Sequence, residues 1–221
     1  MNKYKVILFD LDGTLSDPKV GITKSVQYAL QKMNIVEPDL NKLQCFIGPP
    51  LQVSFVEYYN FDEKNTQKAI GLYRERFKEK GMYENVLYSN IASLLQTLTE
   101  RQFSLVVATS KPTVFAEQIL KYFHIDQYFE RIVGSNLDGT RASKTEIIQY
   151  ILDKYKEYTL SNFIMIGDRK HDIIGANNTG IDSIGVTYGY GTFDELSHSN
   201  PTHIVESVSQ LKDILMGSRF N

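Results

Sequence analysis

The feature that most constrains the fold is a set of short, unbroken apolar runs, each followed at once by polar residues. Residues 6–9 form the first run, and Asp-Leu-Asp-Gly-Thr follows it at residues 10–14. Strands in the interior of a parallel sheet are buried on both faces, and they therefore show continuous rather than alternating apolarity. Four more segments have this shape, the last two less clearly: 105–108, 163–166, 131–134 and 183–186. The sequence thus predicts five buried strands.

Helical patterns lie between these runs. Residues 91–98 carry four apolar side chains at the spacing of one helix face, and residues 147–151 carry three. Helices of this kind connect parallel strands as crossovers. The alternation predicts an α/β fold, with a Rossmann-like, mostly parallel sheet and helices around it.

One interval, from residue 14 to about residue 83, is too long for a single crossover, which needs only about a dozen residues. It contains no strand-like run but has three amphipathic helical patterns, around Leu30, Phe55 and Tyr73. Residues 47–50, Ile-Gly-Pro-Pro, predict a turn between two of these helices. We therefore predict an α/β core domain of residues 1–15 and 82–221, with an inserted helical domain of residues 16–81.

Composition narrows the class of protein. The chain has 24 Lys and Arg residues against 26 Asp and Glu residues, so we expect no nucleic-acid partner, which usually requires a basic surplus. The single Cys45 forms no internal disulfide, and the expected location is cytoplasmic. No apolar run approaches the roughly 20 residues of a membrane helix, so we expect no membrane partner.

Polar side chains gather where the predicted strands end. Asp10 and Asp12 follow the first strand, Thr109 follows a second, and Asp168 and Asp172 follow a third. Ligands of open parallel sheets bind beyond the carboxyl ends of the strands, so these side chains should meet in one cleft. Crowded carboxylates repel one another unless a cation lies between them. Because Mg²⁺ prefers oxygen ligands and is usually bound with substrate phosphate, the pattern predicts a magnesium-dependent phosphate site.

Four motifs, in order along the chain, give it a family resemblance. Residues 10–14, residues 109–112 (Thr-Ser-Lys-Pro), Lys144 and residues 167–172 (Gly-Asp-Arg-Lys-His-Asp) resemble the motifs of the haloacid dehalogenase superfamily. The helical insert resembles the type 1 cap domain of that superfamily. Residues 186–196 resemble its phosphoglycolate-phosphatase-like branch. The resemblance spans nearly the whole chain and implies an Mg²⁺-dependent phosphatase with an aspartate nucleophile.

The resemblance assigns the reaction to aspartates. Asp10 would attack phosphorus and form an aspartyl-phosphate. Asp12 would protonate the leaving alcohol and then activate water. Mg²⁺ would be bound by the carboxylates of Asp10 and Asp168 and by the backbone carbonyl of Asp12. Asp172 would either bind the metal through a water or hold the ligands in position without contacting the metal itself.

Three further side chains are assigned to the phosphoryl group. Thr109, with Ser110 beside it, would bind the phosphoryl oxygens, and Lys144 would bridge the phosphoryl group and the nucleophile. The phosphoglycolate-phosphatase-like branch usually has Pro after this Lys, whereas Thr145 follows Lys144 here. The nearby Arg141 is therefore an alternative to Lys144 as the residue that binds the phosphoryl group.

The motifs leave two segments less defined. Arg169, Lys170 and His171 lie between the two acids of the last motif, and we expect them in a solvated loop. Gly48 and Pro49, in the uncharged turn of the insert, resemble the cap loop that determines substrate choice. Because the turn carries no cation that would select the carboxylate of phosphoglycolate, phosphoglycolate and a nucleoside 5′-monophosphate are both candidate substrates.

Alternatives from other classes stay open. A β-phosphoglucomutase-like sugar phosphomutase would keep Asp12 and be activated by a bisphosphate. A non-catalytic phospho-acceptor or binding module, resembling a receiver domain, also presents an Asp with Mg²⁺ at strand ends, but it lacks the long insert. For the phosphatase we expect a small phosphorylated metabolite as partner and a monomer or homodimer.

Overall fold

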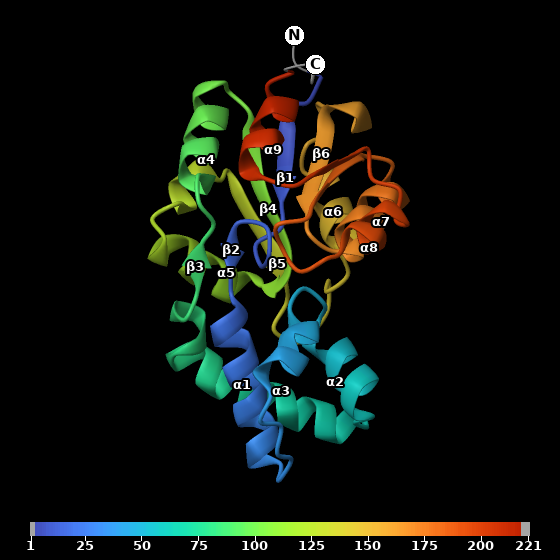
Figure 1. Ribbon diagram of the computed structural model, residues 1–221. Coiled ribbons are helices and arrows are strands. Elements are labelled where there is room, and N and C mark those ends of the chain that lie inside the picture. The colour runs from blue at the N-terminus through green and yellow to red at the C-terminus, as the bar shows by residue number, and fades with distance from the viewer. Residues whose placement is uncertain (1–2, 218–221) are drawn as a thin grey trace. The chain divides into compact units, whose positions relative to one another are not determined.

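The computed structural model describes residues 3–217, which divide into two compact units. The first unit holds the described residues up to Ser16 and from Leu87 onward, and the second holds residues 17–86 (Figure 1). The predicted boundary after residue 15 lies one residue before the observed one, and the predicted boundary after residue 81 lies five residues before the observed one. Residues 1–2 and 218–221 of the predicted core domain lie outside the described residues.

The first unit is built on a parallel sheet with the strand order β5-β4-β1-β6-β7-β8. Its strands are β1 (Val6–Phe9), β4 (Ser104–Pro112), β5 (Arg131–Ser135), β6 (Phe163–Gly167), β7 (Asp182–Val186) and β8 (His203–Val205). The predicted Rossmann-like α/β fold and its five strands are confirmed. The edge strand β8 was missed because its three residues include only two apolar ones, Ile204 and Val205.

The central strand β1 shows why its sequence is apolar throughout. β1 pairs with β4 on one side and with β6 on the other, so that Phe9 is opposite both Val107 and Ile166. Side chains alternate between the faces of a strand, yet all four residues of β1 are completely buried. Both faces of the sheet are therefore covered.

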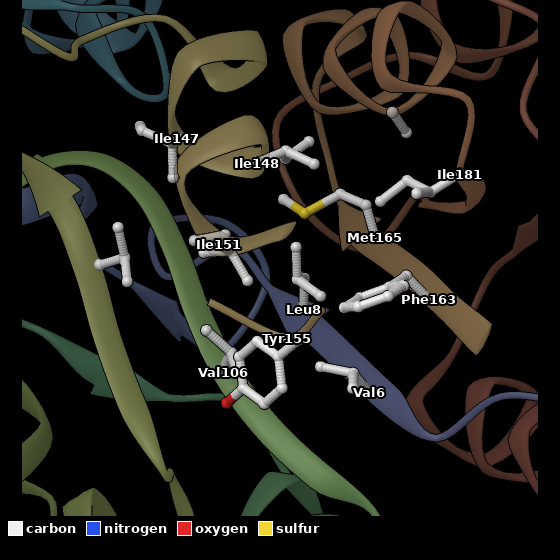
Figure 2. Packing of buried hydrophobic residues seen from close by; sticks show 13 residues of the cluster. Val6, Leu8, Val106, Ile147, Ile148, Ile151, Tyr155, Phe163, Met165 and Ile181 are labelled. Carbon is white, nitrogen blue, oxygen red and sulfur yellow. The ribbon is translucent and has the colours of Figure 1, made fainter. Parts of the chain in front are cut away.

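Helices of the first unit provide this cover. They are α4 (Ile91–Glu100), α5 (Thr113–Tyr122), α6 (Lys144–Leu152), α7 (Lys170–Thr179), α8 (Phe193–Ser197) and α9 (Val208–Leu215), with short 3₁₀ turns η3 (Asp126–Tyr128) and η4 (Leu160–Asn162). α6 packs against α7 and, in Figure 2, Ile148 and Ile151 of α6 lie beside Met165 and Leu8 of the sheet. The predicted helical patterns at residues 91–98 and 147–151 fall on α4 and α6.

The second unit is helical. It contains α1 (Lys19–Lys32), η1 (Leu40–Phe46), α2 (Leu51–Tyr59), α3 (Glu63–Glu79) and η2 (Gly81–Tyr83). The three predicted helical patterns fall on α1, α2 and α3. The segment from residue 47 to residue 50, predicted as a turn, separates η1 from α2, and Gly48 adopts a φ of 103° there, which glycine tolerates best.

A two-stranded ladder lies where the chain passes between the units. Its strands are β2 (Ser16–Asp17) and β3 (Val86–Leu87). β2 lies in the interval for which no strand was predicted, because two residues give no periodic signal. Among the described residues, no helix has the length and apolarity that crossing a membrane requires.

The loop after β7 lies very close to the carboxyl ends of β1 and β6. A Cβ atom on Gly189 would collide with the carbonyl oxygen of Gly13 and with the side chain of Asp168, and one on Gly191 would collide with the carbonyl oxygen of Asp168. Glycine is thus required at both positions by close approach to backbone atoms.

We expect Gly189→Ala to destabilise the protein by about 2 kcal/mol or more, because overpacking against backbone forces the loop to move. Gly71→Ala is the matched control: Gly71 is exposed on α3, and a Cβ atom added there would have no neighbouring atom within 4 Å. In a helix interior this change should stabilise by up to about 1 kcal/mol. Urea unfolding of the three proteins measures both effects, and equal midpoints for Gly189→Ala and wild type would contradict the expectation.

An ion pair joins the end of α3 to the chain that leaves the second unit. The Nη1 and Nη2 atoms of Arg76 donate to Oε2 and Oε1 of Glu84 at 2.8 and 3.1 Å, and both side chains are mostly buried. These hydrogen bonds from Arg76 are the main cause that lowers the pKa of Glu84 below its usual value. A lowered pKa means that the pair stabilises the fold above the pKa of unfolded Glu and loses this contribution as the pH falls.

We therefore expect Glu84→Gln to lower the free energy of unfolding at pH 7 by about 1 kcal/mol, a value that allows for partial solvent screening. The difference from wild type should disappear as the pH falls below about 4. Glu37→Gln is the control and should have little effect, since Glu37 faces the exposed Lys42 at 3.8 Å and an amide oxygen can still accept the N–H of Asp39. A Glu84→Gln effect that stays constant down to about pH 3 would argue against an electrostatic origin.

Candidate active site

The strand order brings the predicted motif residues to one edge of the sheet. β4, β1 and β6 are neighbours, and in their register Asp10 continues β1 at the level of Ala108 and Gly167. The backbone N–H of Asp10 still donates to the carbonyl of Ile166 at 2.9 Å. Three segments far apart in the sequence therefore place their polar side chains together.

A tight turn follows Asp10. The carbonyl oxygen of Leu11 accepts from the backbone N–H groups of Thr14, Leu15 and Ser16, and Gly13 has a φ of 83°. The N–H of Leu11 donates to Oδ1 of Asp10 at 2.7 Å. The turn therefore fixes the Asp10 carboxylate through its own backbone.

Lys144 connects three of the motifs. It is the first residue of α6, which Ser143 and Glu146 cap. Its ammonium group lies 2.7 Å from Oδ1 of Asp10 and 2.6 Å from Oδ1 of Asp172, and it donates to the Ala108 carbonyl at 2.8 Å. Burial would lower the pKa of Lys144, but the two carboxylates outweigh it and raise the pKa, which keeps this lysine charged.

Asp168 and Asp172 complete a buried acidic cluster. Oδ2 of Asp168 accepts from the N–H of Tyr190 at 2.7 Å, and Oδ2 of Asp172 accepts from the N–H of Arg169 at 3.1 Å. Burial, together with the neighbouring carboxylates of Asp172 and Asp10, raises the pKa of Asp168 well above its usual value. Burial also raises the pKa of Asp172 to about 6, against the opposite pull of Lys144.

The cluster has the chemistry of a metal site. Asp10, Asp168 and Asp172 are all buried, and one oxygen of each lies within 4.8 Å of the others. Close carboxylates that share a dry site are stabilised by a cation between them, and carboxylate oxygens are the ligands that Mg²⁺ prefers. These residues thus fit the predicted metal. Asp10 has its contacts with Lys144 and Leu11 on one oxygen, Oδ1, whereas Asp168 and Asp172 each have a contact on both oxygens.

The second motif lies in an irregular part of β4. Ala108 pairs with Val133 but Pro112 pairs with Ser135, so β4 bulges between these pairs. Bulges turn side chains out of the regular alternation. Thr109 and Ser110 are buried in this bulge, and Thr109 Oγ1 accepts from the backbone N–H of Lys111 at 3.3 Å.

Asp12 has a lysine partner that the sequence did not reveal. The ammonium group of Lys111 lies 2.8 Å from Oδ2 of Asp12, and both side chains are buried. Burial raises the pKa of Asp12, and the contact with Lys111 offsets this only in part. The sequence places Lys111 in the second motif, where it could reach the substrate or hold a turn, but it does not pair Lys111 with Asp12, because two residues so far apart in one sequence carry no pairing signal.

Other predicted residues lie differently. Lys170 is exposed as expected, but it begins the helix α7 with His171, so the expectation of a loop is wrong for both residues. The expectation is also wrong for Arg169, which is partly buried and whose Nε donates to Glu195 at 2.9 Å. These residues start the helix because Asp172 accepts the N–H of Arg169 there.

Arg141, the alternative to Lys144, is outside the acidic cluster. Its Nε donates to the Gly134 carbonyl at 3.0 Å, and its guanidinium lies over the ring of Tyr150. Gly48 and Pro49 belong to the second unit, so the first unit's acidic cluster does not include them.

Three curated relatives match along nearly the whole chain. A 5′-nucleotidase from Pseudomonas aeruginosa is 48% identical over 96% of both chains. The tyrosine-protein kinase PtkA of Mycobacterium tuberculosis is 33% identical over 96% of this chain and 72% of its own length. A phosphoglycolate phosphatase from Vibrio parahaemolyticus is 28% identical over 96% of both chains.

The fold has a close match among solved structures. The crystal structure of a predicted phosphatase from Clostridium acetobutylicum superposes with a TM-score of 0.94 at 50% identity, covering 97% of this chain and 99% of that one. The family model of the haloacid dehalogenase-like hydrolases matches residues 7–186. These matches and the motif geometry agree with the predicted resemblance. The chain belongs to the haloacid dehalogenase-like hydrolase family, and it is an enzyme of the phosphatase type.

Proposed function

We propose that this protein is a Mg²⁺-dependent phosphomonoesterase that hydrolyses a small phosphate ester through an aspartyl-phosphate on Asp10. The observation that carries the proposal is the contact of Lys144 with both Asp10 and Asp172 inside the buried cluster. A lysine held there orients the Asp10 carboxylate and places a positive charge beside it, which a nucleophile needs when it approaches a phosphate dianion.

In the proposed reaction, Asp10 attacks phosphorus with Oδ2, because Lys144 and the N–H of Leu11 both contact Oδ1. Thr109 and Ser110 bind phosphoryl oxygens from the bulge of β4, and Lys144 balances the charge that builds up. Asp12 gives its proton to the leaving alcohol oxygen and later takes one from the water that hydrolyses the phospho-enzyme.

The metal site of the proposal consists of the Asp10 and Asp168 carboxylates and the Asp12 backbone carbonyl. Bound there, Mg²⁺ would supply charge neutralisation for the phosphoryl group and the nucleophile. Asp172 does not bind the metal in this proposal, but its ion pair with Lys144 holds that lysine in position. Tyr190 holds Asp168 through its backbone N–H.

A nucleoside 5′-monophosphate is the better-supported substrate class. The relative named 5′-nucleotidase is 48% identical, whereas the phosphoglycolate phosphatase is 28% identical. The sugar phosphomutase remains the alternative, because it would use the same nucleophile and Asp12.

We expect Asp10→Asn to reduce phosphate release from nucleoside 5′-monophosphates by at least about 10³-fold, since an amide is a poor nucleophile. Release by wild type should require Mg²⁺ and stop with EDTA. Asp153→Asn, an exposed position at the end of α6, is the matched control and should stay near wild-type activity.

The same experiment separates the alternatives. Acid-quenched wild type should carry phosphate label from substrate, and Asp10→Asn should carry none. Release that persists in Asp10→Asn would refute the mechanism. No release from any ester, but interconversion of sugar phosphates once a bisphosphate is added, would identify the mutase.

The proposal assigns substrate choice to Gly48 and Pro49, on the family resemblance of their turn. We expect Pro49→Ala to change the ratio of kcat/KM between a nucleoside 5′-monophosphate and phosphoglycolate by about threefold to tenfold. The Mg²⁺ concentration for half-maximal rate should not change. Equal losses on both esters would count against a role in specificity.

A further inference from the structure

Lys111 has no part in the proposed reaction, yet it contacts one of its central groups. Its ammonium nitrogen lies 2.8 Å from Oδ2 of Asp12, and the side chains of Lys111 and Asp12 are only 6% and 9% exposed. A lysine this deeply buried in an ion pair is uncommon, because removing the two charges from water is costly.

The backbone around Lys111 is held on both sides. Its N–H donates to Thr109 Oγ1 at 3.3 Å, and the next residue, Pro112, is in register with Ser135 of β5. The Ser135 hydroxyl in turn donates to the carbonyl of Ser110 at 2.9 Å. The bulge of β4 thus presents the lysine from a fixed backbone position.

The two oxygens of the Asp12 carboxylate have different surroundings. Oδ2 faces Lys111, whereas Oδ1 is buried and has no hydrogen-bond partner among residues 3–217. A buried carboxylate oxygen without a partner is costly and rare in folded proteins. Oδ1 of Asp12 therefore has vacant lone pairs at the reaction centre, where a group that arrives with the substrate can bind it.

We propose that Lys111 is a positioning residue for Asp12, which fixes the rotation of its carboxylate so that Oδ1 carries the proton in catalysis. This inference rests on the proposed function. In the first step, the bond from phosphorus to the alcohol oxygen breaks while the bond to Asp10 forms, and the proton on Oδ1 passes to the alcohol oxygen. In the second step, water attacks phosphorus and its proton returns to Oδ1, while the bond to Asp10 breaks and phosphate leaves.

A competing role for Lys111 is direct contact with the phosphoryl group. The two roles predict different dependence on the leaving group. Protonation matters greatly for an alkoxide, such as the ribose oxygen of a nucleoside 5′-monophosphate, and little for p-nitrophenolate, which is stable as an anion. Loss of a phosphoryl contact would affect both esters equally, because both contain the same phosphoryl group.

The test compares kcat/KM for a nucleoside 5′-monophosphate and for p-nitrophenyl phosphate in Lys111→Met. We expect a loss of about 100-fold on the nucleotide and less than about fivefold on the aryl ester, in the range that general acid catalysis contributes. Rapid mixing with the aryl ester should show a burst of p-nitrophenol, since water activation by Asp12 would also slow. Lys111→Arg should recover part of the nucleotide activity by keeping the cation.

Two controls make the result specific. Lys121→Met changes an exposed lysine on α5 and should leave both rates unchanged. Asp12→Asn combined with Lys111→Met should lose no more nucleotide activity than Asp12→Asn alone, because the lysine acts only through Asp12. If Lys111→Met does not fold, Lys111→Gln, which keeps a hydrogen-bond donor, takes its place in both comparisons.

Equal losses on the two esters, or additive losses in the double variant, would overturn the inference. Unchanged rates on both would do so as well. None of these outcomes affects the proposed function, which depends on Asp10 and on the phosphate label in the acid-quenched wild type.

Discussion

The site depends on the burial of four carboxylates at one edge of a parallel sheet. Two ammonium groups, Lys144 and Lys111, contact three of these carboxylates and so balance only part of their charge. The fourth, Asp168, has no lysine contact in the described part of the chain, and burial and its acidic neighbours raise its pKa. An arrangement with this excess of negative charge is more stable when it binds a cation, which is the physical basis of the proposed metal site.

The sheet makes this concentration of charge possible. Strands such as β1 lie between buried neighbours and bury all of their side chains, so the first positions with access to polar groups are those just beyond the strand ends. Backbone groups then stabilise the acids: the N–H groups of Leu11, Tyr190 and Arg169 each donate to one of them. The loop with Gly189 and Gly191 belongs to this frame, because only glycine allows it close enough for the N–H of Tyr190 to reach Asp168.

Much of the fold and of the acidic cluster could be predicted from the sequence. Buried parallel strands have a clear signature, and residues that follow neighbouring strands must share an edge, so the meeting of Asp10 with Asp168 followed from periodicity and topology. Pairings between side chains did not follow. The contact of Lys111 with Asp12 depends on a bulge in β4, and Arg169 turns toward Glu195 because α7 starts one residue after it. Such details depend on local backbone geometry, which residue type and spacing do not specify.

The two lysines differ in what they hold, and this affects how their loss is to be interpreted. Lys144 pairs with two buried carboxylates and donates to a carbonyl, so its removal takes the neighbouring cation away from both acids at once. Removing one member of a buried ion pair typically costs about 3–5 kcal/mol, and an activity loss at Lys144 therefore mixes catalysis with stability. Lys111 contacts the Asp12 carboxylate through Oδ2, and the oxygen it leaves alone is the one facing the reaction in our proposal. Lys111 is also a member of a buried ion pair, so its removal costs stability as well. Its loss nevertheless leaves the contacts of Lys144 with Asp10 and Asp172 in place, so that a comparison of two leaving groups can separate orientation of Asp12 from binding of the phosphoryl group.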